Sequence, residues 1–209
     1  MIRMQKLFSK SSLLTGCLLV LLSVSCKQDD PQKEDTPELV TKATLTFVPT
    51  GGGANVVVTA TDPDGEGVQS ITVDGPIQLT ANTTYVMTIQ MINGLLTPGE
   101  PGYDITEEVA VEGQEHQFFF AWTNNAFSNP TGDGNLDHGA DPINYAGGPN
   151  SKDIGGLNLG ITTTWTAGSV AATGTFRIVL KHQPGTKTSV SDATVGETDL
   201  DLTFVLTIQ

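Results

Sequence analysis

From residue 43 onward, the chain is a succession of short β-prone runs separated by turn-forming residues, and this pattern restricts the folds open to it. The runs are rich in Val, Ile, Thr and Phe, and Gly, Pro, Asn or Asp stands between them, as in strands joined by tight turns. They cover residues 43–47, 55–61, 70–73, 77–80, 84–92, 115–122, 157–166, 174–182 and 199–208. No run has convincing helical periodicity, although residues 105–112 fit either a short helix or an irregular strand.

We therefore predict an all-β fold, a single antiparallel immunoglobulin-like β-sandwich over residues 42–209. Its core should contain seven large apolar side chains: Phe47, Phe118, Phe120, Trp122, Phe176, Leu180 and Phe204. Residues 123–156 interrupt the rhythm of the strands. Apart from Tyr145 and a few aliphatic residues this insertion has little to bury, so we expect a long surface loop.

The first 26 residues have the organisation of a bacterial lipoprotein signal. Cations near the start precede an apolar run at residues 13–24, which is too short to span a bilayer as a helix, and small residues lead into Cys26. We predict that residues 1–25 are removed and that Cys26 carries the lipid. Residues 14–17 match the usual lipobox better locally, but cleavage before Cys17 would leave apolar residues 18–24 on the mature chain.

Removal of the signal changes the chemistry open to the chain. Its 2 cysteines lie in the signal and at the lipid-bearing position, so no disulfide or thiolate metal site remains. Loss of the cations Arg3, Lys6 and Lys10 reduces Lys plus Arg from 10 to 7 against 23 Asp plus Glu, which takes the formal charge from −13 to −16. Such a surface repels nucleic acid and attracts cations.

Residues 26–41, beginning with the lipid-bearing cysteine, are polar, acidic and proline-bearing, as expected of a flexible tether. The tetrapeptide at 27–30, Lys-Gln-Asp-Asp, resembles the acidic export tag of surface-exposed lipoproteins in Bacteroidota. We therefore expect a protein anchored by lipid to the outer membrane and displayed at the cell surface. The periplasmic face is the alternative.

Two of the three histidines have informative positions. His182 ends the run 174–182 on the same face as its large apolar residues, and His116 stands near the start of the run 115–122 on the corresponding face. If the two strands are antiparallel neighbours, the end of one lies beside the start of the other. The two histidines would then meet at one margin of the sheet.

Carboxylates flank both histidines in the sequence. Two imidazoles with one or two carboxylates are a plausible set for Zn²⁺ or another divalent transition metal. The candidate ligands are His116, His182, Glu107, Glu108, Glu115 and Glu197. The spacing lacks a tight motif such as HExxH, and the alternative is a pair of rim histidines that hydrogen-bond to backbone or carboxylate groups.

The insertion contains an acidic loop with partial resemblance to an EF-hand calcium loop. The residues concerned are Asp133, Asn135, Asp137 and Asp141. The first three match ligand positions of that loop, but His138 replaces its glycine and Asn144 stands where the bidentate Glu should be. A weak Ca²⁺ site and a plain acidic loop both stay open. Residues 62–67 copy the start of such a loop, yet their place between two strands favours a hairpin turn.

Motifs typical of enzymes are absent from the sequence: there is no Gly-x-Ser-x-Gly elbow, Walker loop or dinucleotide fingerprint. The adjacent pair Glu107 and Glu108 would point to opposite faces of a strand, which does not suit an acid–base pair. We therefore predict a non-catalytic binding protein.

Four stretches of the sequence resemble small Bacteroidota lipoproteins designated "type 1 periplasmic binding fold superfamily", some of them encoded beside TonB-dependent transporters. The stretches are residues 104–108, 115–120, 180–184 and 196–199. A periplasmic binding fold would need alternating β and α units, which this chain lacks. The resemblance implies a role in nutrient acquisition and matches five residues to its motifs: His116, His182, Glu107, Glu108 and Glu197. The insertion departs from the family pattern, so no role for His138 follows.

Two functions of different classes are consistent with these features. The first is capture of a divalent transition metal, zinc above all, for a TonB-dependent uptake system in the outer membrane. The second is a structural or adhesive surface sandwich whose acidic loops bind Ca²⁺. The distance between His116 and His182 in the folded chain is the simplest observation that separates them.

Overall fold

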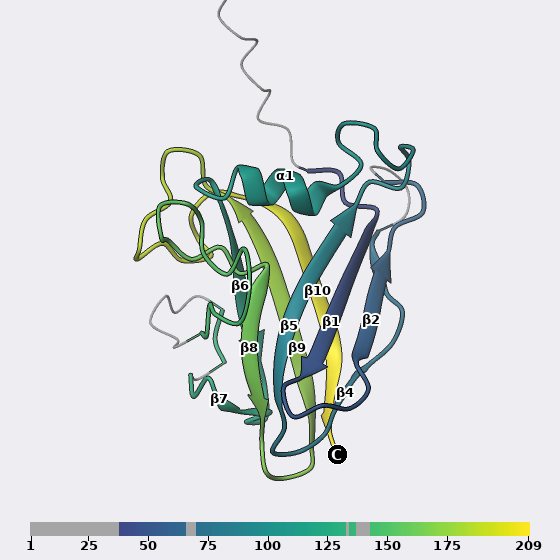
Figure 1. The fold of residues 1–209 in the computed structure, drawn as a ribbon, viewed down its shortest axis with the longest axis vertical. Coiled ribbons are helices and arrows are strands. Elements are labelled where there is room, and N and C mark those ends of the chain that lie inside the picture. Colours follow the sequence, from purple (N-terminus) through teal and green to yellow (C-terminus); the bar gives the residue numbers. More distant parts are fainter. Residues whose placement is uncertain (1–37, 66–69, 133, 137–142) are drawn as a thin grey trace, which may run out of the picture. The chain divides into compact units, whose positions relative to one another are not determined.

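The computed structural model describes residues 38–65, 70–132, 134–136 and 143–209, which belong to one compact unit, Thr36–Gln209 (Figure 1). The elements are β1 Lys42–Pro49, β2 Val56–Thr61, β3 Thr72–Val73, β4 Ile77–Leu79, β5 Thr84–Ile92, α1 Ile105–Val111, β6 His116–Trp122, β7 Phe127–Asn129, β8 Thr162–Ala167, β9 Ala172–His182 and β10 Glu197–Ile208. Most strands coincide with the runs identified in the sequence, but β7 was not expected and β8 begins at Thr162, inside the predicted run 157–166.

The strands form two sheets that pack face to face, which confirms the prediction of an all-β sandwich. One sheet has the strand order β3-β2-β1-β5-β8-β7 and the other has the order β4-β10-β9-β6. All pairings within them are antiparallel except that of β4 with β10, which is parallel. The expectation of a purely antiparallel sandwich was therefore wrong at β4, a strand of 3 residues.

Alternation of apolar and polar residues builds the core. Along β1, the side chains of Ala43, Leu45 and Phe47 are fully buried, because successive side chains of a strand point to opposite faces. All seven predicted core residues are buried. At the centre, Trp165 meets the rings of Phe120 and Phe176 edge to face, with centroids 5.3 and 5.0 Å away, a geometry that aromatic pairs favour.

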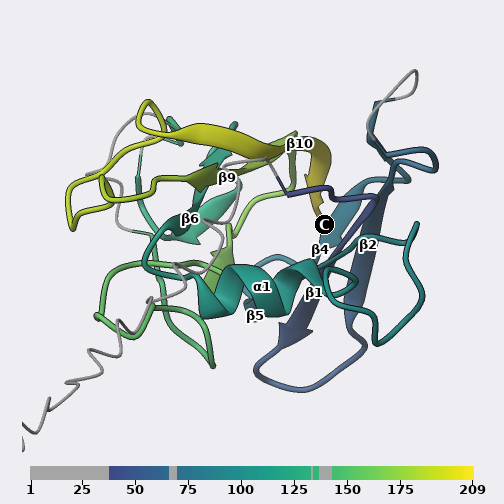
Figure 2. The ribbon, with the colours of Figure 1, turned by 90° about the horizontal axis from the view of Figure 1, so that it is seen from above.

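Residues 105–111 form a helix, which resolves the ambiguity left by the sequence. The side chain of Asp104 caps its start by accepting a hydrogen bond from the Glu107 amide at 3.1 Å. Ile105 and Val109 are buried, and α1 crosses one end of the sandwich, as the view in Figure 2 shows. Within the described part of the chain, no helix has the length and hydrophobicity needed to cross a membrane.

The insertion after β6 is more than a surface loop, so that prediction was wrong in part. Phe127 begins a short edge strand, β7, and is buried beside Trp165 at a centroid distance of 4.7 Å. The Tyr145 hydroxyl donates to the Phe118 carbonyl at 2.8 Å, and the Phe118 amide donates to the Leu159 carbonyl at 2.7 Å. These contacts cover the open edge of β6, which would otherwise expose unpaired backbone groups.

Candidate metal centre

The two histidines lie side by side where β6 begins and β9 ends. Their Cα atoms are directly paired in the antiparallel ladder, and their rings stack with centroids 4.6 Å apart and an interplanar angle of 10°. The meeting expected from the strand positions is therefore present. His116 is fully buried, whereas the His182 side chain is 14% exposed.

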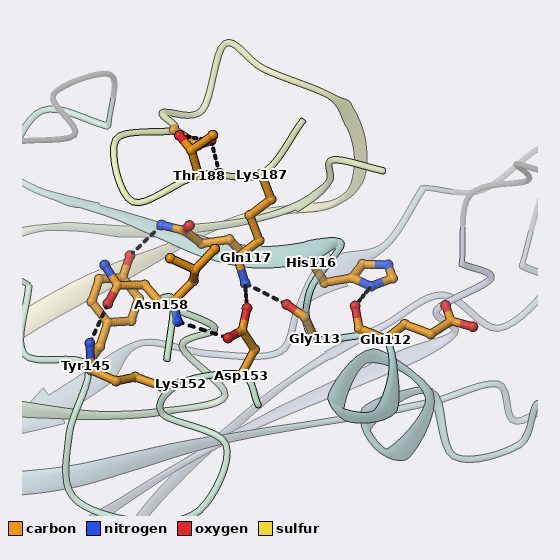
Figure 3. A network of polar contacts seen from close by, with 12 residues as sticks. Glu112, Gly113, His116, Gln117, Tyr145, Lys152, Asp153, Asn158, Lys187 and Thr188 are labelled. Atoms are coloured by element: carbon orange, nitrogen blue, oxygen red, sulfur yellow. Dashed lines mark hydrogen bonds and ion pairs between the residues drawn. The ribbon is translucent and has the colours of Figure 1, made fainter. Parts of the chain in front are cut away.

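The polar contacts of His116 fix the orientation of its ring. Nδ1 lies 3.2 Å from the carbonyl oxygen of Glu112, at the end of α1 (Figure 3). A carbonyl can only accept, so Nδ1 carries the proton and the neutral ring keeps the lone pair of Nε2 for another partner. This is the arrangement in which a backbone carbonyl orients a metal-binding histidine.

Nε2 of His116 faces Asp199 on β10. The distance to the Asp199 Oδ2 atom is 3.7 Å, too long for a hydrogen bond, and both side chains are buried. Two ligands bonded to one tetrahedral ion at about 2.1 Å lie about 3.4 Å apart. The separation of these two atoms is therefore close to that of neighbouring ligands.

A β-bulge turns Asp199 inward. In the ladder between β9 and β10, Thr198 pairs with Lys181 and Leu200 pairs with Leu180, so Asp199 is an extra residue without a partner in register. Simple alternation with Leu200 would point its side chain away from the core. The bulge therefore explains why strand alternation did not indicate Asp199 as a candidate ligand.

The Asp199 carboxylate is held in an unfavourable environment. Its side chain is fully buried and neither oxygen accepts a hydrogen bond of ordinary geometry. Burial raises the pKa of this carboxyl to about 6, against the opposing effects of His182, the Glu38 amide and Lys181. A buried carboxylate with so little compensation is typical of a functional site.

Two further carboxylates converge on His116 from different parts of the chain. Glu112 follows α1, and Glu38 lies ahead of β1. One ligand atom from each of Glu38, Glu112 and His116 lies within 4.8 Å of the others. Small movements of the two flexible glutamates would bring this set to bonding distance from one ion. Neither glutamate was a predicted ligand. Glu38 falls within the expected tether, and Glu112 lies at the end of a helix that the sequence did not distinguish from a strand.

The stacking of the two imidazoles limits what they can do together. An imidazole binds a metal ion in the plane of its ring, and two parallel, stacked planes share no such point. Of the two histidines, only His116 belongs to the converging set. His182 packs on its face, and its own Nε2 lies 3.6 Å from the Glu115 carboxylate.

The remaining predicted ligands, Glu197, Glu107 and Glu108, do not belong to the converging set. Glu197 is exposed and pairs with His182 in the ladder. The close approach of these strands depends on Gly196, which has a φ of 80°, because a side chain there would collide with the His182 carbonyl. Glu107 and Glu108 lie on α1 and are not among the three residues whose ligand atoms converge.

An acidic hollow adjoins the cluster. It has a volume of about 440 Å³ and lies along α1. Five carboxylates are among its lining residues: Glu100, Asp104, Glu107, Glu108 and Glu112. Glu112 thus belongs both to this hollow and to the converging set. A recess lined by charges of one sign concentrates ions of the opposite sign, here cations.

A buried ion pair supports the turn that carries these ligands. Lys187 and Asp153 are each 1% exposed at the side chain, with Nζ 2.8 Å from Oδ2 (Figure 3). The same Nζ donates to the Gly113 carbonyl at 2.5 Å. Burial opposes ionisation of Asp153, but the Lys187 hydrogen bond and charge and the Leu157 and Gly155 amides outweigh it and lower the pKa of its carboxyl.

Most of the predicted calcium ligands lie outside the described residues. Asp133, Asp137, Asp141 and His138 lie outside the described residues, as does Cys26, while Asn135 is described and exposed. At the other loop, Asp62 Oδ1 accepts hydrogen bonds from the amides of Asp64 and Gly65 at 3.3 and 3.1 Å. That geometry is an Asx turn and agrees with the hairpin interpretation.

The described part of the chain is thus a β-sandwich with a histidine–carboxylate cluster at one end, beside α1. Comparison of the chain with protein families, with curated proteins and with solved structures found no match.

Proposed function

We propose that this protein binds a divalent transition metal ion, zinc by its donor set, through Glu38, Glu112 and His116. The observation that carries the proposal is the convergence of three ligand atoms within 4.8 Å beside the buried Asp199 carboxylate. One imidazole and two or three carboxylates suit Zn²⁺ better than Ca²⁺, which prefers oxygen ligands alone. The acidic hollow along α1 would raise the local concentration of the cation.

The setting of this activity is part of the same proposal. The signal pattern ending at Cys26 and the acidic tether support a lipid-anchored protein of the outer membrane, displayed at the cell surface. Such a protein would capture the ion without catalysis and pass it to a TonB-dependent transporter. The resemblance of four stretches to lipoproteins encoded beside such transporters supports this partner.

Calorimetric titration with Zn²⁺ alone tests the site. We expect His116→Ala to weaken binding by about 100-fold or more, since even loss of a group that orients a ligand costs about 10–100-fold. His182→Ala should cost about 10-fold, because it removes only the stacked neighbour. Affinity of the wild type should fall as the pH drops through about 6.5, where imidazole gains its proton.

Asp74→Asn is the matched control for this titration, because it removes an exposed carboxylate outside both the converging set and the acidic hollow. It should leave Zn²⁺ affinity nearly unchanged. Weak binding of equal strength by all four proteins would contradict the metal function. A structural or adhesive sandwich with Ca²⁺-binding loops would then be the better description.

Metabolic labelling with a radioactive fatty acid tests the anchor. Cys26→Ser should abolish incorporation of lipid, because the thiol of that residue is the expected attachment point. Cys17→Ser should leave the mature protein unchanged, because that residue would be lost with the signal. Loss of label from the Cys17 variant alone would show that the mature chain begins there.

A further inference from the structure

The chain is fixed firmly in the sandwich only from Val40 onward. Val40 is buried in the core. The Thr41 amide donates to the Ile92 carbonyl at 3.0 Å, its hydroxyl accepts from the Gly94 amide at 2.7 Å, and its carbonyl accepts from the Asp62 amide at 2.7 Å. These contacts place a rigid boundary two residues after Glu38.

Glu38 and Leu39 lie outside the β ladder, and both are half-exposed. Leu39 packs beside Gly65, where an added Cβ would lie 3.3 Å from one of its methyl groups. A hollow of about 210 Å³ is lined in part by Glu38, Leu39, Asp62 and Asp199. Glu38 and Leu39 therefore border open volume as well as the domain.

Glu38 lies among ionisable groups. Its carboxylate joins the set with Glu112 and His116, and its backbone amide lies near enough to Asp199 to lower the pKa of that carboxyl. The carboxylates of Glu38, Glu112 and Asp199 lie around one imidazole, and when ionised they place three negative charges there. Repulsion among these charges works against the inward position of Glu38. A bound dication would instead attract all three carboxylates.

We infer that Glu38 is the moving part of a metal-dependent strap: residues 38–39 close onto the corner between α1 and β6 when a divalent ion binds, and loosen when it leaves. This inference rests on the proposed function, because it requires an ion at Glu38, Glu112 and His116. The strap lies at the domain end of the expected tether, residues 26–41. Metal occupancy would therefore set how freely the domain turns on its anchor, and so how it is presented to a partner.

A spin label introduced by Thr36→Cys reports on the strap, in the soluble chain that begins at Lys27 and contains the whole compact unit Thr36–Gln209. This form has no other cysteine. Addition of Zn²⁺ alone should lengthen the rotational correlation time of the label severalfold. Glu38→Gln and His116→Ala should each abolish that change. Glu34→Gln removes the same charge from the tether and should leave it intact.

Calorimetry on the same labelled proteins separates the proposed metal function from the strap. If Zn²⁺ binds the wild type but label mobility does not change, the strap is wrong and the metal function stands. If Zn²⁺ slows the label in the Glu38→Gln variant as much as in the wild type, Glu38 is not the closing residue and the strap is again wrong. If Zn²⁺ does not bind at all, both the proposed function and the strap fall.

Discussion

Replacement of Lys187 by alanine is expected to lower the free energy of unfolding by about 3–5 kcal/mol, the usual cost of leaving one partner of a buried ion pair alone. Lys187 and Asp153 are each 1% exposed at the side chain. The variant would leave the Asp153 carboxylate buried without its cation. Its Oδ1 atom would still accept a hydrogen bond from the Leu157 amide, at 2.9 Å in the wild type. Urea unfolding at pH 7 measures the change.

Arg177→Ala is the matched control for this measurement. Arg177 and Asp201 also form an ion pair, at 2.6 Å, but their side chains are 42% and 41% exposed. Solvent screening limits such a pair to about 1 kcal/mol or less. Equal effects of the two substitutions would mean that the Lys187–Asp153 pair is as well solvated as the surface pair.

The same variant should disturb the candidate metal centre. Lys187 also holds the Gly113 carbonyl, in the turn between Glu112 and His116. Loss of that bond would loosen two of the three converging ligands. Lys187→Ala should therefore weaken Zn²⁺ binding although it touches none of them, whereas Arg177→Ala should not.

Replacement of Asp199 by asparagine is expected to stabilise the metal-free protein by about 2–3 kcal/mol at pH 8, since each unit of pKa shift corresponds to about 1.4 kcal/mol. An unperturbed aspartate has a pKa of 3.8, whereas the pKa of this carboxyl in the folded protein is about 6. Burial is the main cause. Asparagine has nearly the same shape and removes the buried charge.

The sign of the pH dependence follows from these two values. Between pH 3.8 and about 6, the folded protein keeps a proton on Asp199 that the unfolded chain has released. Stability of the wild type is therefore lost as the pH rises through this window, and the cost is complete above pH 6. The two proteins should be equally stable near pH 3.5 and diverge as the pH increases.

Asp201→Asn is the control for the charge itself. It lies two residues along β10, is exposed and pairs with Arg177. Its substitution should be neutral or slightly destabilising at pH 8. If Asp199→Asn destabilises the metal-free protein at that pH, the Asp199 carboxylate is better solvated than its burial implies. With Zn²⁺ present, the wild type should recover more stability than the Asp199→Asn variant.

The sequence predicted the sandwich because alternation of apolar and polar residues is a direct consequence of strand geometry. It also predicted the meeting of His116 and His182, since each ends a core-facing row. It could not choose between helix and strand for residues 105–112, where Ile105 and Val109 fit a helical repeat of only two turns. Both patterns are compatible with so few apolar positions.

The ligands that the sequence missed were hidden by local irregularities. Asp199 points inward only because of a bulge that alternation does not encode. Glu112 lies just beyond the end of α1, so its position depended on where that helix ends. Glu38 has the composition of the tether, and only the fold brings it to His116. The Lys187–Asp153 pair joins two loops 34 residues apart, with no periodic signal in either.

The three converging residues of the proposed site, and Asp199 beside them, come from distant points of the chain, near residues 38, 112–116 and 199. In the unfolded protein these groups are far apart, so the proposed metal site would exist only after the sandwich has formed. Binding of the proposed ion would therefore have to follow folding, in whichever compartment the chain folds. A saturating ion at 100 times its dissociation constant would add about 2.7 kcal/mol by mass action. For a chain with no cysteine beyond position 26, the proposed ion would act as a reversible cross-link that forms only after folding.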